Sequence, residues 1–391
     1  MSILVVNIGS SSLKFALYST ESNALQSYTS GLFAGLEPHG EIRFSYTHKN
    51  TKHKQTLPSQ NEPILYAIET LQSYIKEWLE IDLLAVAHRV VHGGSKYKQP
   101  ILVDEAVIRD LRELNTLAPL HQPYNIKGIE AFMKYFDGTP QVACFDTSFH
   151  QYESNLEVHY PLPESFFAQG IRKYGFHGLS YEYISSQLLN TTPKAKGKML
   201  MAHLGNGSSL CACKNGTSVA TTMGFSALDG LMMGTRSGSI DSGVLLYLLA
   251  NGYNYEKLTD LLYKKSGLLG VSELSADMKT LQESSNEKAK FAIELYIHRL
   301  IKEMGGLIAV MRGVDIISFS GGIGEHGSDI RSQLALQLDY LGAVLDEEKN
   351  AQATGKEICA IHKSNSKIEI WVVPTNEEYI CAKSAVRLLG E

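Results

Sequence analysis

The sequence of 391 residues lacks a long hydrophobic run and an excess of basic residues. Its longest aliphatic runs, such as Val244 to Ala250, are far shorter than the ~20 residues that a membrane helix needs. Lys and Arg number 36 against 41 Asp and Glu, and this net charge of −5 argues against nucleic-acid wrapping and a polybasic membrane surface. We therefore expect neither a membrane nor a nucleic acid as a partner.

Cysteine is also scarce, with five residues at scattered positions. An odd, scattered set in a chain of this length is typical of reduced thiols rather than of a disulfide framework. The segment from Met1 to Asn7 has neither a basic leader nor an apolar stretch of signal-peptide length. We therefore expect no secretion and a cytoplasmic location.

Several catalytic signatures are missing. Gly197-Lys198 and Gly355-Lys356 are not followed by Ser or Thr, so the chain has no P-loop. His88-Arg89 continues into Val90, unlike the catalytic loop of protein kinases, and no Gly-x-Ser-x-Gly elbow of an α/β hydrolase occurs. These absences exclude three large enzyme classes.

No metal-ligating pattern is present either. His88 and His92 are four residues apart, but their neighbours are strand-like, and four residues of a strand cover ~13 Å, too far for one metal ion. Cys211 and Cys213 have no second Cys or His pair at ligand spacing. We interpret these cysteines as core thiols.

The composition that is present, 44% hydrophobic and 20% charged residues, is that of a globular chain, and its length predicts two or three domains. Apolar segments alternate with helical patterns, which predicts an α/β architecture. The expected strands are Ile3 to Val6, Leu13 to Tyr18, two around residues 40–60, Ala85 to Val91, Gln141 to Phe145, Met199 to Ala202, Leu210 to Cys213, Val314 to Phe319 and Ile368 to Val373. The expected helices run from Pro63 to near Leu79, from Asn286 to Arg312, up to about Leu338 and from Glu377 to Leu389.

Two segments repeat one arrangement of strand, turn rich in Gly and Ser, and strand. The first turn is Asn7 to Ser12, and the second is Gly205 to Ser209. We interpret this as an internal duplication, with a second unit beginning after His150. Within the long helix, Gly305 and Gly306 indicate a place where another element packs closely.

Three turns rich in glycine and serine, the two just named and Ser320 to Glu325, follow strand-like segments. Their backbone N–H groups can hold phosphate oxygens with no Cβ in the way, which favours a nucleotide triphosphate held between two domains. The third turn also contains Gly322, Gly324 and Gly327 in the Gly-x-Gly-x-x-Gly spacing of dinucleotide sites. That alternative needs an acid that ends a second strand, whereas Asp346, Glu347 and Glu348 lie in a charged stretch.

Four polar residues are candidate catalytic groups. Arg89 and Arg236 lie beside glycines, as anion-clamping arginines do when phosphate turns are present, and His177 lies between Gly175 and Gly178. Asp146 ends a strand, so its carboxylate should point out of the carboxyl edge of the sheet, where ligands of α/β proteins bind. A capping role for Asp146 is the alternative.

Seven motifs, in this order and spacing, resemble the acetate kinase family within the superfamily of acetate and sugar kinases, Hsp70 and actin. They are Asn7 to Phe15, Ala87 to Gly94, Phe145 to His150, Tyr174 to Ser180, His203 to Ser209, Met233 to Gly238 and Gly322 to Glu325. The resemblance implies an α/β fold of two duplicated ribonuclease-H-like (actin-like ATPase) domains around a nucleotide cleft. It implies an N-terminal acyl kinase domain of residues 1–150 with 378–391, a C-terminal nucleotide-binding domain of residues 151–377, and a homodimer.

The resemblance also implies a reaction: direct, reversible phosphoryl transfer from ATP to acetate, giving acetyl phosphate and ADP. Mg2+ is the implied cofactor, and Mn2+ would substitute for it. A propionate kinase with the same chemistry is one alternative. The alternative of a different class is an actin-like or Hsp70-like ATPase without an acyl substrate, against which the paired arginines and the lack of an appended partner-binding domain weigh.

Roles follow from the resemblance residue by residue. The implied catalytic residues are Asp146, His177 and Arg236, and the implied acyl-binding residues are Arg89, Val91, Leu120, Phe176 and Ala227. The implied nucleotide-binding residues are Lys14, Ser10, Ser12, His203, Leu204, Gly205, Asn206, Gly207, Asp277, Met278, Lys279, Gly322, Ile323, Gly324, Glu325 and His326. Asn7 and Glu377 are the implied metal ligands.

The chemistry of this reaction needs charge compensation more than base catalysis. A carboxylic acid with a pKa near ~4 is already ionised at neutral pH. The difficulty is that one anion approaches another, which Mg2+, Arg89, Arg236 and His177 would offset. We therefore expect Asp146 to orient an arginine or a metal-bound water rather than to abstract a proton.

Four departures from the family pattern bear on specificity. Ser226 to Gly230 stands where Thr-Pro-Leu-Glu-Gly is common, which puts Ala227 at the place of a proline, and Ser237 to Ser242 replaces Gly-Asp-Ile-Asp-Pro. His326 replaces an asparagine and Lys279 an arginine. We expect these changes to affect acyl chain length and nucleotide preference, with propionate approaching or exceeding acetate.

Overall fold

The computed structural model describes residues 1–20, 25–78 and 83–390, and it divides into two compact units. Unit 1 comprises Met1–Ser148 with Asn376–Glu391, and unit 2 comprises Phe149–Thr375. The chain passes between the units after Ser148 and after Thr375, and the boundaries expected from the sequence lie two residues beyond each of these points. Each unit contains one mixed sheet flanked by helices, so the predicted α/β class is confirmed.

The sheet of unit 1 has the strand order β5-β4-β3-β2-β1-β6-β8-β7. β1, β6 and β8 are parallel, and the other neighbours are antiparallel. Its strands are β1 (Ser2–Ile8), β2 (Ser12–Ser19), β3 (Gln26–Ala34), β4 (Ile42–His48), β5 (Thr51–Leu57), β6 (Leu83–Val90), β7 (Ile101–Leu102) and β8 (Gln141–Phe145). Lys52, His53 and Lys54 lie exposed on β5.

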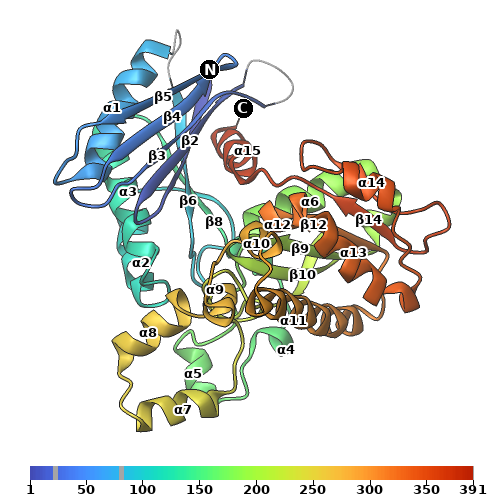
Figure 1. Cartoon of the computed structure of the whole chain (residues 1–391). Coiled ribbons are helices and arrows are strands. Elements are labelled where there is room, and N and C mark those ends of the chain that lie inside the picture. Colours follow the sequence, from blue (N-terminus) through green and yellow to red (C-terminus); the bar gives the residue numbers. More distant parts are fainter. Residues whose placement is uncertain (21–24, 79–82, 391) are drawn as a thin grey trace. The chain divides into compact units, whose positions relative to one another are not determined.

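Helices cover both faces of this sheet. α1 and α3 lie on one face, and α15 lies on the other, against β1 and β6 (Figure 1). The helices are α1 (Pro63–Trp78), α2 (Glu105–Glu113), α3 (Gln122–Tyr135) and α15 (Glu377–Leu389). The expected end of α1 at Leu79 lies outside the described residues. α15 follows the last strand of unit 2 along the chain but completes the core of unit 1.

The sheet of unit 2 has the order β11-β10-β9-β12-β14-β13, in which β9, β12 and β14 are parallel. Its strands are β9 (Lys198–Leu204), β10 (Ser208–Lys214), β11 (Thr217–Thr221), β12 (Ile316–Ser320), β13 (Cys359–Ala360) and β14 (Glu369–Val372). Both sheets therefore share one series of strands. Three antiparallel neighbours (β3-β2-β1 and β11-β10-β9) are followed by two strands parallel to the last of them (β6-β8 and β12-β14) and by a short antiparallel edge strand (β7 and β13). This shared order supports the internal duplication expected from the turns.

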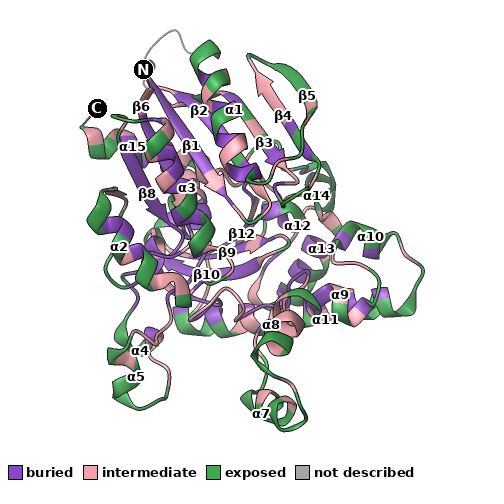
Figure 2. Cartoon of the chain, turned by 90° about the vertical axis from the view of Figure 1, so that its left-hand side faces the viewer, coloured by how far each residue is buried: buried purple, intermediate pink, exposed green. Residues whose placement is uncertain are grey.

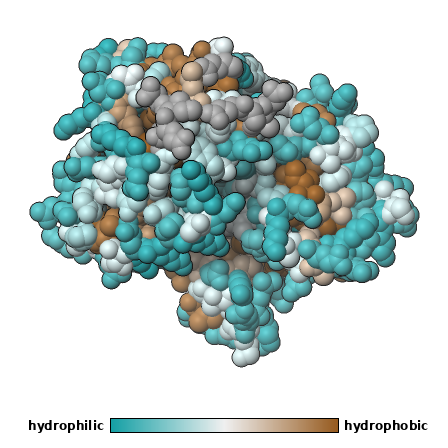
Figure 3. All heavy atoms as spheres, turned by 90° about the horizontal axis from the view of Figure 1, so that it is seen from above, coloured by the Kyte–Doolittle hydropathy of each residue, from teal (hydrophilic) through white to brown (hydrophobic). Residues whose placement is uncertain are grey.

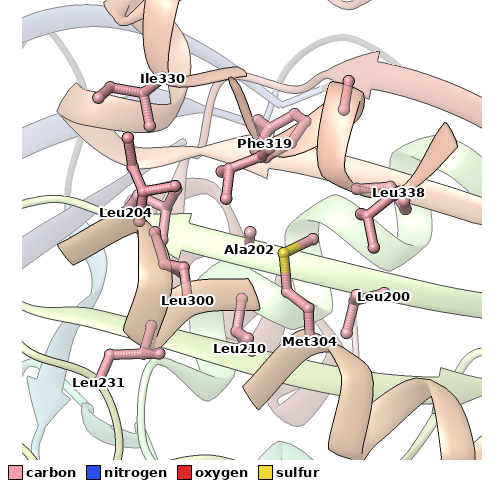
Figure 4. Close-up of a cluster of buried hydrophobic side chains, with 14 of the residues drawn as sticks. Leu200, Ala202, Leu204, Leu210, Leu231, Leu300, Met304, Phe319, Ile330 and Leu338 are labelled. Carbon is pink, nitrogen blue, oxygen red and sulfur yellow. The ribbon is translucent and has the colours of Figure 1, made fainter. Parts of the chain in front are cut away.

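The core of unit 2 lies on both faces of its sheet because both alternating sets of β9 side chains are apolar. Leu200, Ala202 and Leu204 pack against Leu300 and Met304 of α11 (Figure 4), whereas Met199 and Met201 pack against α6. The helices are α4 (Asn155–Val158), α5 (Glu164–Ala168), α6 (Gly178–Thr191), α7 (Ser242–Ala250), α8 (Tyr255–Lys264), α9 (Gly267–Ser272), α10 (Met278–Gln282), α11 (Glu287–Met311), α12 (Gly321–His326), α13 (Ser328–Gln337) and α14 (Glu347–Gln352).

Three details differ from the expectations. β3 was not expected, because its apolar residues do not alternate regularly. The expected close packing at Gly305 and Gly306 is wrong, since a Cβ on either would meet nothing within 4 Å. The single helix expected up to Leu338 is two helices, because α12 ends at His326 and α13 begins at Ser328.

The surface and the cysteines agree with the composition. No helix within the described ranges is long and apolar enough to cross a membrane. All five cysteines are free thiols, and four of them are buried. The face seen in Figure 3 is mostly hydrophilic with several small apolar groups, and Figure 2 shows the buried residues concentrated in the sheets.

Candidate active site

Arg89 lies between two carboxylates at the carboxyl edge of the unit 1 sheet. It is near the end of β6, and the buried Asp146 directly follows the neighbouring β8. Arg89 Nε and Nη2 donate to the Asp146 carboxylate at 2.8–3.2 Å. Its Nη1 lies 3.1 Å from Oε2 of Glu377 at the start of α15. A buried carboxylate paired side-on with an arginine orients that arginine, which is the role expected for Asp146.

The charges of this cluster stabilise one another. Burial alone lowers the pKa of Arg89, but Asp146 and Glu377 together raise it well above its ordinary value. A guanidinium has five N–H groups, and the contacts it makes with described residues leave one on Nη1 and one on Nη2. Arg89 is therefore a fixed cation with a partly unused edge, which suits a second carboxylate.

The turn between β1 and β2 holds the predicted phosphate and metal residues of unit 1. Gly9 N–H donates to the Ser12 carbonyl at 2.9 Å, which closes the turn that carries Ser10. Asn7 pairs with Lys14 across the hairpin, so their side chains share one face of the sheet. Lys14 Nζ lies 2.5 Å from Glu378 Oε1, a partner that sequence reasoning missed although Glu378 directly follows Glu377.

Asn125 of α3 joins three segments of unit 1 and was not identified from the sequence. Its Nδ2 donates to the Ile8 carbonyl at 2.8 Å, and its Oδ1 accepts from Val91 N–H at 3.0 Å. Val91 and Leu120, the predicted acyl-binding residues of this unit, are both half-buried. Asn125 thus holds the segment after β6 against the end of β1.

The turn after β9 brings together several predicted residues of unit 2. A Cβ on Gly207 would lie 3.4 Å from His177 Nε2 and 3.8 Å from Arg236 Nη1. A Cβ on Gly205 would lie 3.9 Å from the backbone N of Gly322. Glycine at both positions leaves the turn open to these groups. The segments His203 to Gly207 and Gly321 to Gly324 are therefore neighbours, with His177 and Arg236 beside them.

His177 is held in an uncommon backbone conformation at the start of α6. Its φ of 57° and ψ of 23° lie in the left-handed region, which is rare for residues other than glycine. Its Nδ1 lies 2.8 Å from Ser209 Oγ, which also contacts the hydroxyl of the buried Tyr181 at 2.5 Å. The ring stacks on His203 with centroids 4.2 Å apart. These contacts fix the ring and leave its Nε2 side toward Gly207.

Arg236 lies half-buried in the loop before α7. Its Nη1 donates to the Ala227 carbonyl at 3.1 Å, so the predicted acyl-binding residue and the predicted catalytic arginine are in contact. Burial lowers the pKa of Arg236, with a smaller opposing effect of Tyr263. Within the described ranges no carboxylate forms an ion pair with it. Arg236 is therefore a desolvated cation without a counter-charge, which favours an anionic ligand.

Glu325 and Arg331 hold the third turn, Ser320 to Glu325, through hydrogen bonds to its backbone. Glu325 Oε1 accepts from the backbone N–H groups of Gly321 and Thr375 at 2.9 and 3.1 Å. Arg331 of α13 is fully buried, and its guanidinium donates to the carbonyls of Gly324, Glu325, Asn350 and Ala353 and to Asn350 Oδ1. Sequence reasoning missed Arg331, because a polar residue in a helix pattern gives no sign of burial.

The segment Asp277 to Lys279 is the least supported part of the predicted nucleotide site. Asp277 caps α10 by accepting from Thr280 N–H and Oγ1, which lowers its pKa. Met278 is buried in the core, so it could contact a ligand only through its backbone. Lys279 is exposed and lies 3.8 Å from Glu283.

The dinucleotide alternative is not supported by this geometry. β12 and β14 are parallel neighbours, so the fingerprint does open a βαβ unit. However, β14 runs into Val373 and Pro374 where a ribose-binding acid would stand. Asp346 does not end a strand but caps α14.

Comparison with known proteins decides the family. The model of the acetokinase family matches residues 2–383. The chain belongs to the acetokinase family. The acetate kinase of Rickettsia prowazekii is 40% identical over 389 residues, which cover 99% of both chains.

Solved acetokinase structures share the fold across the whole chain. The acetate kinase of Porphyromonas gingivalis has a TM-score of 0.90 at 35% identity and covers 99% of both chains. A propionate kinase from Francisella tularensis has a TM-score of 0.91 at 36% identity and covers 98% of both chains. The predicted fold class of two actin-like ATPase domains is therefore confirmed.

Acetokinase membership leaves the metal ligands to be tested against the residues themselves. Within the described residues, no group of three or more His, Cys, Asp or Glu side chains could hold a metal ion. Mg2+ does not need one, since it is bound through one or two protein oxygens, waters and substrate phosphates. Asn7 and Glu377 supply such oxygens, and Glu377 Oε1 has no recorded partner in the described part of the chain. The donor set fits Mg2+.

Proposed function

We propose that this acetokinase is an acetate kinase that transfers the γ-phosphoryl group of ATP directly to acetate, giving acetyl phosphate and ADP. The observation that carries the proposal is Arg236, a desolvated arginine that forms no ion pair within the described residues, beside His177 Nε2 and the Gly207 turn. A cation whose charge is not balanced there, next to a glycine turn, suits the transferring phosphoryl group, whose charge grows on its equatorial oxygens.

Each side chain has one task in this proposal. Arg89, oriented by Asp146, binds the acyl carboxylate through its unused N–H groups, and Val91, Leu120, Phe176 and Ala227 line the acyl chain. The turns at Ser10 and Ser12 with Lys14, at His203 to Gly207 and at Gly322 to His326, with Asp277 to Lys279, bind the nucleotide. His177 and Arg236 stabilise the phosphoryl group during transfer. No side chain needs to abstract a proton, because the acceptor is already a carboxylate.

A metal ion completes the charge balance. Asn7 and Glu377 would hold Mg2+, or Mn2+ in its place, which neutralises phosphate charge when bound. Glu377 also contacts Arg89, so the same side chain would link the cation to the acyl-binding arginine. We propose unit 1 as the acyl kinase domain and unit 2 as the nucleotide-binding domain.

The test is acyl-phosphate trapping. Hydroxylamine added to the enzyme with Mg-ATP and acetate should give acetyl hydroxamate in an amount equal to the ADP formed. ATP hydrolysis that is indifferent to any carboxylic acid would favour the actin-like or Hsp70-like ATPase instead.

Propionate kinase is the second candidate. It is favoured by Ala227, which stands where the family pattern has a proline, and by the fold shared with the propionate kinase of Francisella tularensis. The same assay with propionate in place of acetate, compared as kcat/KM, distinguishes the two.

We also propose a homodimer, with α7 in its interface. α7 is apolar on all sides, and Val244, Leu246, Tyr247 and Leu249 are 46–68% exposed (Figure 2). Exposed apolar residues that follow one another on one helix are typical of an interaction site. Light scattering should give the mass of two chains, and Leu246→Glu with Tyr247→Glu should reduce it to one.

A further inference from the structure

Three buried polar residues of unit 2 form a hydrogen-bonded chain that the proposed function does not use. His150 is the second residue of unit 2, Glu153 lies one turn later, and Ser218 is on β11. Their relative exposures are 1%, 9% and 1%. Buried polar groups are costly unless each is satisfied, so their arrangement requires an explanation.

The hydrogen bonds of this chain hold both nitrogens of the His150 ring. His150 Nε2 donates to the Phe176 carbonyl at 3.0 Å, because a carbonyl oxygen can only accept. On the other side of the ring, Nδ1 lies 2.8 Å from Ser218 Oγ, and Ser218 Oγ donates to Glu153 Oε1 at 2.7 Å. Glu153 Oε1 is also 3.3 Å from Nδ1, so Ser218 and Glu153 together hold this side of the ring.

The ring of His150 also packs against the backbone before His177. Gly175 has a φ of 73°, and a Cβ there would lie 2.5 Å from His150 Cδ2. His150 therefore packs against Gly175 and donates to the carbonyl of Phe176, the residue directly before His177. His177 itself is left-handed, a conformation that is unfavourable for a residue with a Cβ and persists only where its surroundings impose it.

We propose that His150 is a positioning residue for phosphoryl transfer. Ser218 and Glu153 hold its ring, and the ring fixes the peptide between Phe176 and His177. Through that peptide it keeps His177 left-handed and its Nε2 beside Gly207 and Arg236. The inference rests on the proposed function, in which His177 stabilises the transferring group. A purely structural histidine would stabilise unit 2 without acting through His177.

The experiment compares two amides of different reach. His150→Gln places an amide N–H near the position of Nε2, where it can donate to the Phe176 carbonyl, whereas His150→Asn is too short. Wild type is first shown to form acetyl hydroxamate, and the thermal stability of each variant is measured. We expect His150→Asn to lower kcat about 10²-fold with KM for acetate and ATP within about twofold, and His150→Gln to recover most of the loss.

A double-mutant cycle with His177→Gln tests the route of the effect. If His150 acts through His177, adding His150→Asn to His177→Gln should lower kcat no further. Losses that multiply, equal losses in the Asn and Gln variants, a loss confined to KM, or unfolding of both variants would each overturn the inference.

One measurement is independent of catalysis. Nitrogen NMR of the imidazole rings in the folded wild type should show a proton on Nε2 of His150, as its hydrogen bond to the Phe176 carbonyl requires. An Nε2 without a proton would overturn the inference. Wild type that forms no hydroxamate while His150 Nε2 carries a proton would instead count against the proposed function.

Discussion

Arg89, near the end of β6, and Arg236, in the loop before α7, are both half-buried, but their surroundings differ. Arg89 contacts Asp146 and Glu377, and these carboxylates raise its pKa. Arg236 contacts the Ala227 carbonyl, and burial lowers its pKa. Within the described residues its charge has no ionic partner.

This difference indicates two kinds of anion site. A neutralised arginine is rigid and contributes to folding, since removal of its charge leaves buried carboxylates behind. A desolvated arginine without a partner contributes little to folding but interacts strongly with an anion that arrives. The comparison therefore predicts that Arg89 matters for stability and activity, and Arg236 for activity alone.

The largest expected effect is the loss of activity at Arg236. Arg236→Gln should lower kcat/KM for acetate by about 10³ to 10⁵, because one arginine on a transferring phosphoryl group is worth that much. Arg236→Lys should recover little, since a point charge cannot reproduce a planar two-pronged contact. Hydroxamate kinetics measure both.

Arg172→Gln is the matched control, because Arg172 is another half-buried arginine of unit 2, with its guanidinium over the Phe167 ring. It should keep nearly wild-type activity. Activity near wild type in Arg236→Lys would remove Arg236 from the site.

The next effect is on stability and separates the two arginines. Arg89→Gln should lower the free energy of unfolding by about 3 to 5 kcal/mol, because Asp146 and Glu377 lose their shared cation. Arg236→Gln should change it by less than about 1 kcal/mol, because within the described residues no carboxylate paired with Arg236 is left behind. Urea unfolding measures both.

A second substitution sharpens this contrast. Asp146→Asn in the Arg89→Gln background should restore part of the stability, since it removes the unpaired buried carboxylate. Equal losses of stability in Arg89→Gln and Arg236→Gln would refute the comparison.

The third expected effect is a dependence of the unfolding free energy on pH, which arises at His88, the residue before Arg89. Burial lowers the pKa of His88 to about 4, with a smaller opposing effect of its hydrogen bond to Gln141. In the unfolded chain the pKa of His88 is ~6.5. Between pH values of about 4 and 6.5 the unfolded state therefore binds a proton at His88 that the native state does not bind. Stability should therefore fall as the pH drops from about 6.5 to about 4, by about 3 kcal/mol in all.

His88→Gln keeps an amide facing Gln141 and removes the titration, so its unfolding free energy should depend less on pH over this range. His53→Gln, which changes an exposed histidine, is the control. An unchanged slope in His88→Gln would contradict the prediction.

The smallest expected effect is on the preference between acetate and propionate, and it is tested at Ala227, the residue whose carbonyl contacts Arg236. Ala227→Pro fills volume in the proposed acyl pocket and keeps the carbonyl that accepts from Arg236. The ratio of kcat/KM for propionate to that for acetate should fall about fourfold, the worth of one buried CH2. A wild type that rejects propionate, with an unchanged ratio in Ala227→Pro, would place residue 227 outside the acyl pocket.

Most elements were predictable because their signals are local. The strands at Gln141–Phe145 and the helix Glu377–Leu389 follow from apolar runs, periodicity and turn residues alone. The order of the motifs was sufficient to indicate the family. The break between α12 and α13 was missed, because one glycine within a helical pattern does not by itself end a helix.

The sequence by itself determined which residues are chemically competent: the glycine turns, Arg89, Asp146, His177 and Arg236. Their residue types and immediate neighbours carry that information, since turn chemistry depends on a few adjacent residues.

Only the tertiary structure decided how these residues are paired. Sheet order and the return of α15 to unit 1 bring Glu377 to Arg89, while no acid reaches Arg236 within the described residues. Burial likewise turns His150 and Arg331 into supports for neighbouring backbone carbonyls. The physical reason is that partners far apart in sequence meet through strand register and packing, and desolvation then sets the strength of each charge.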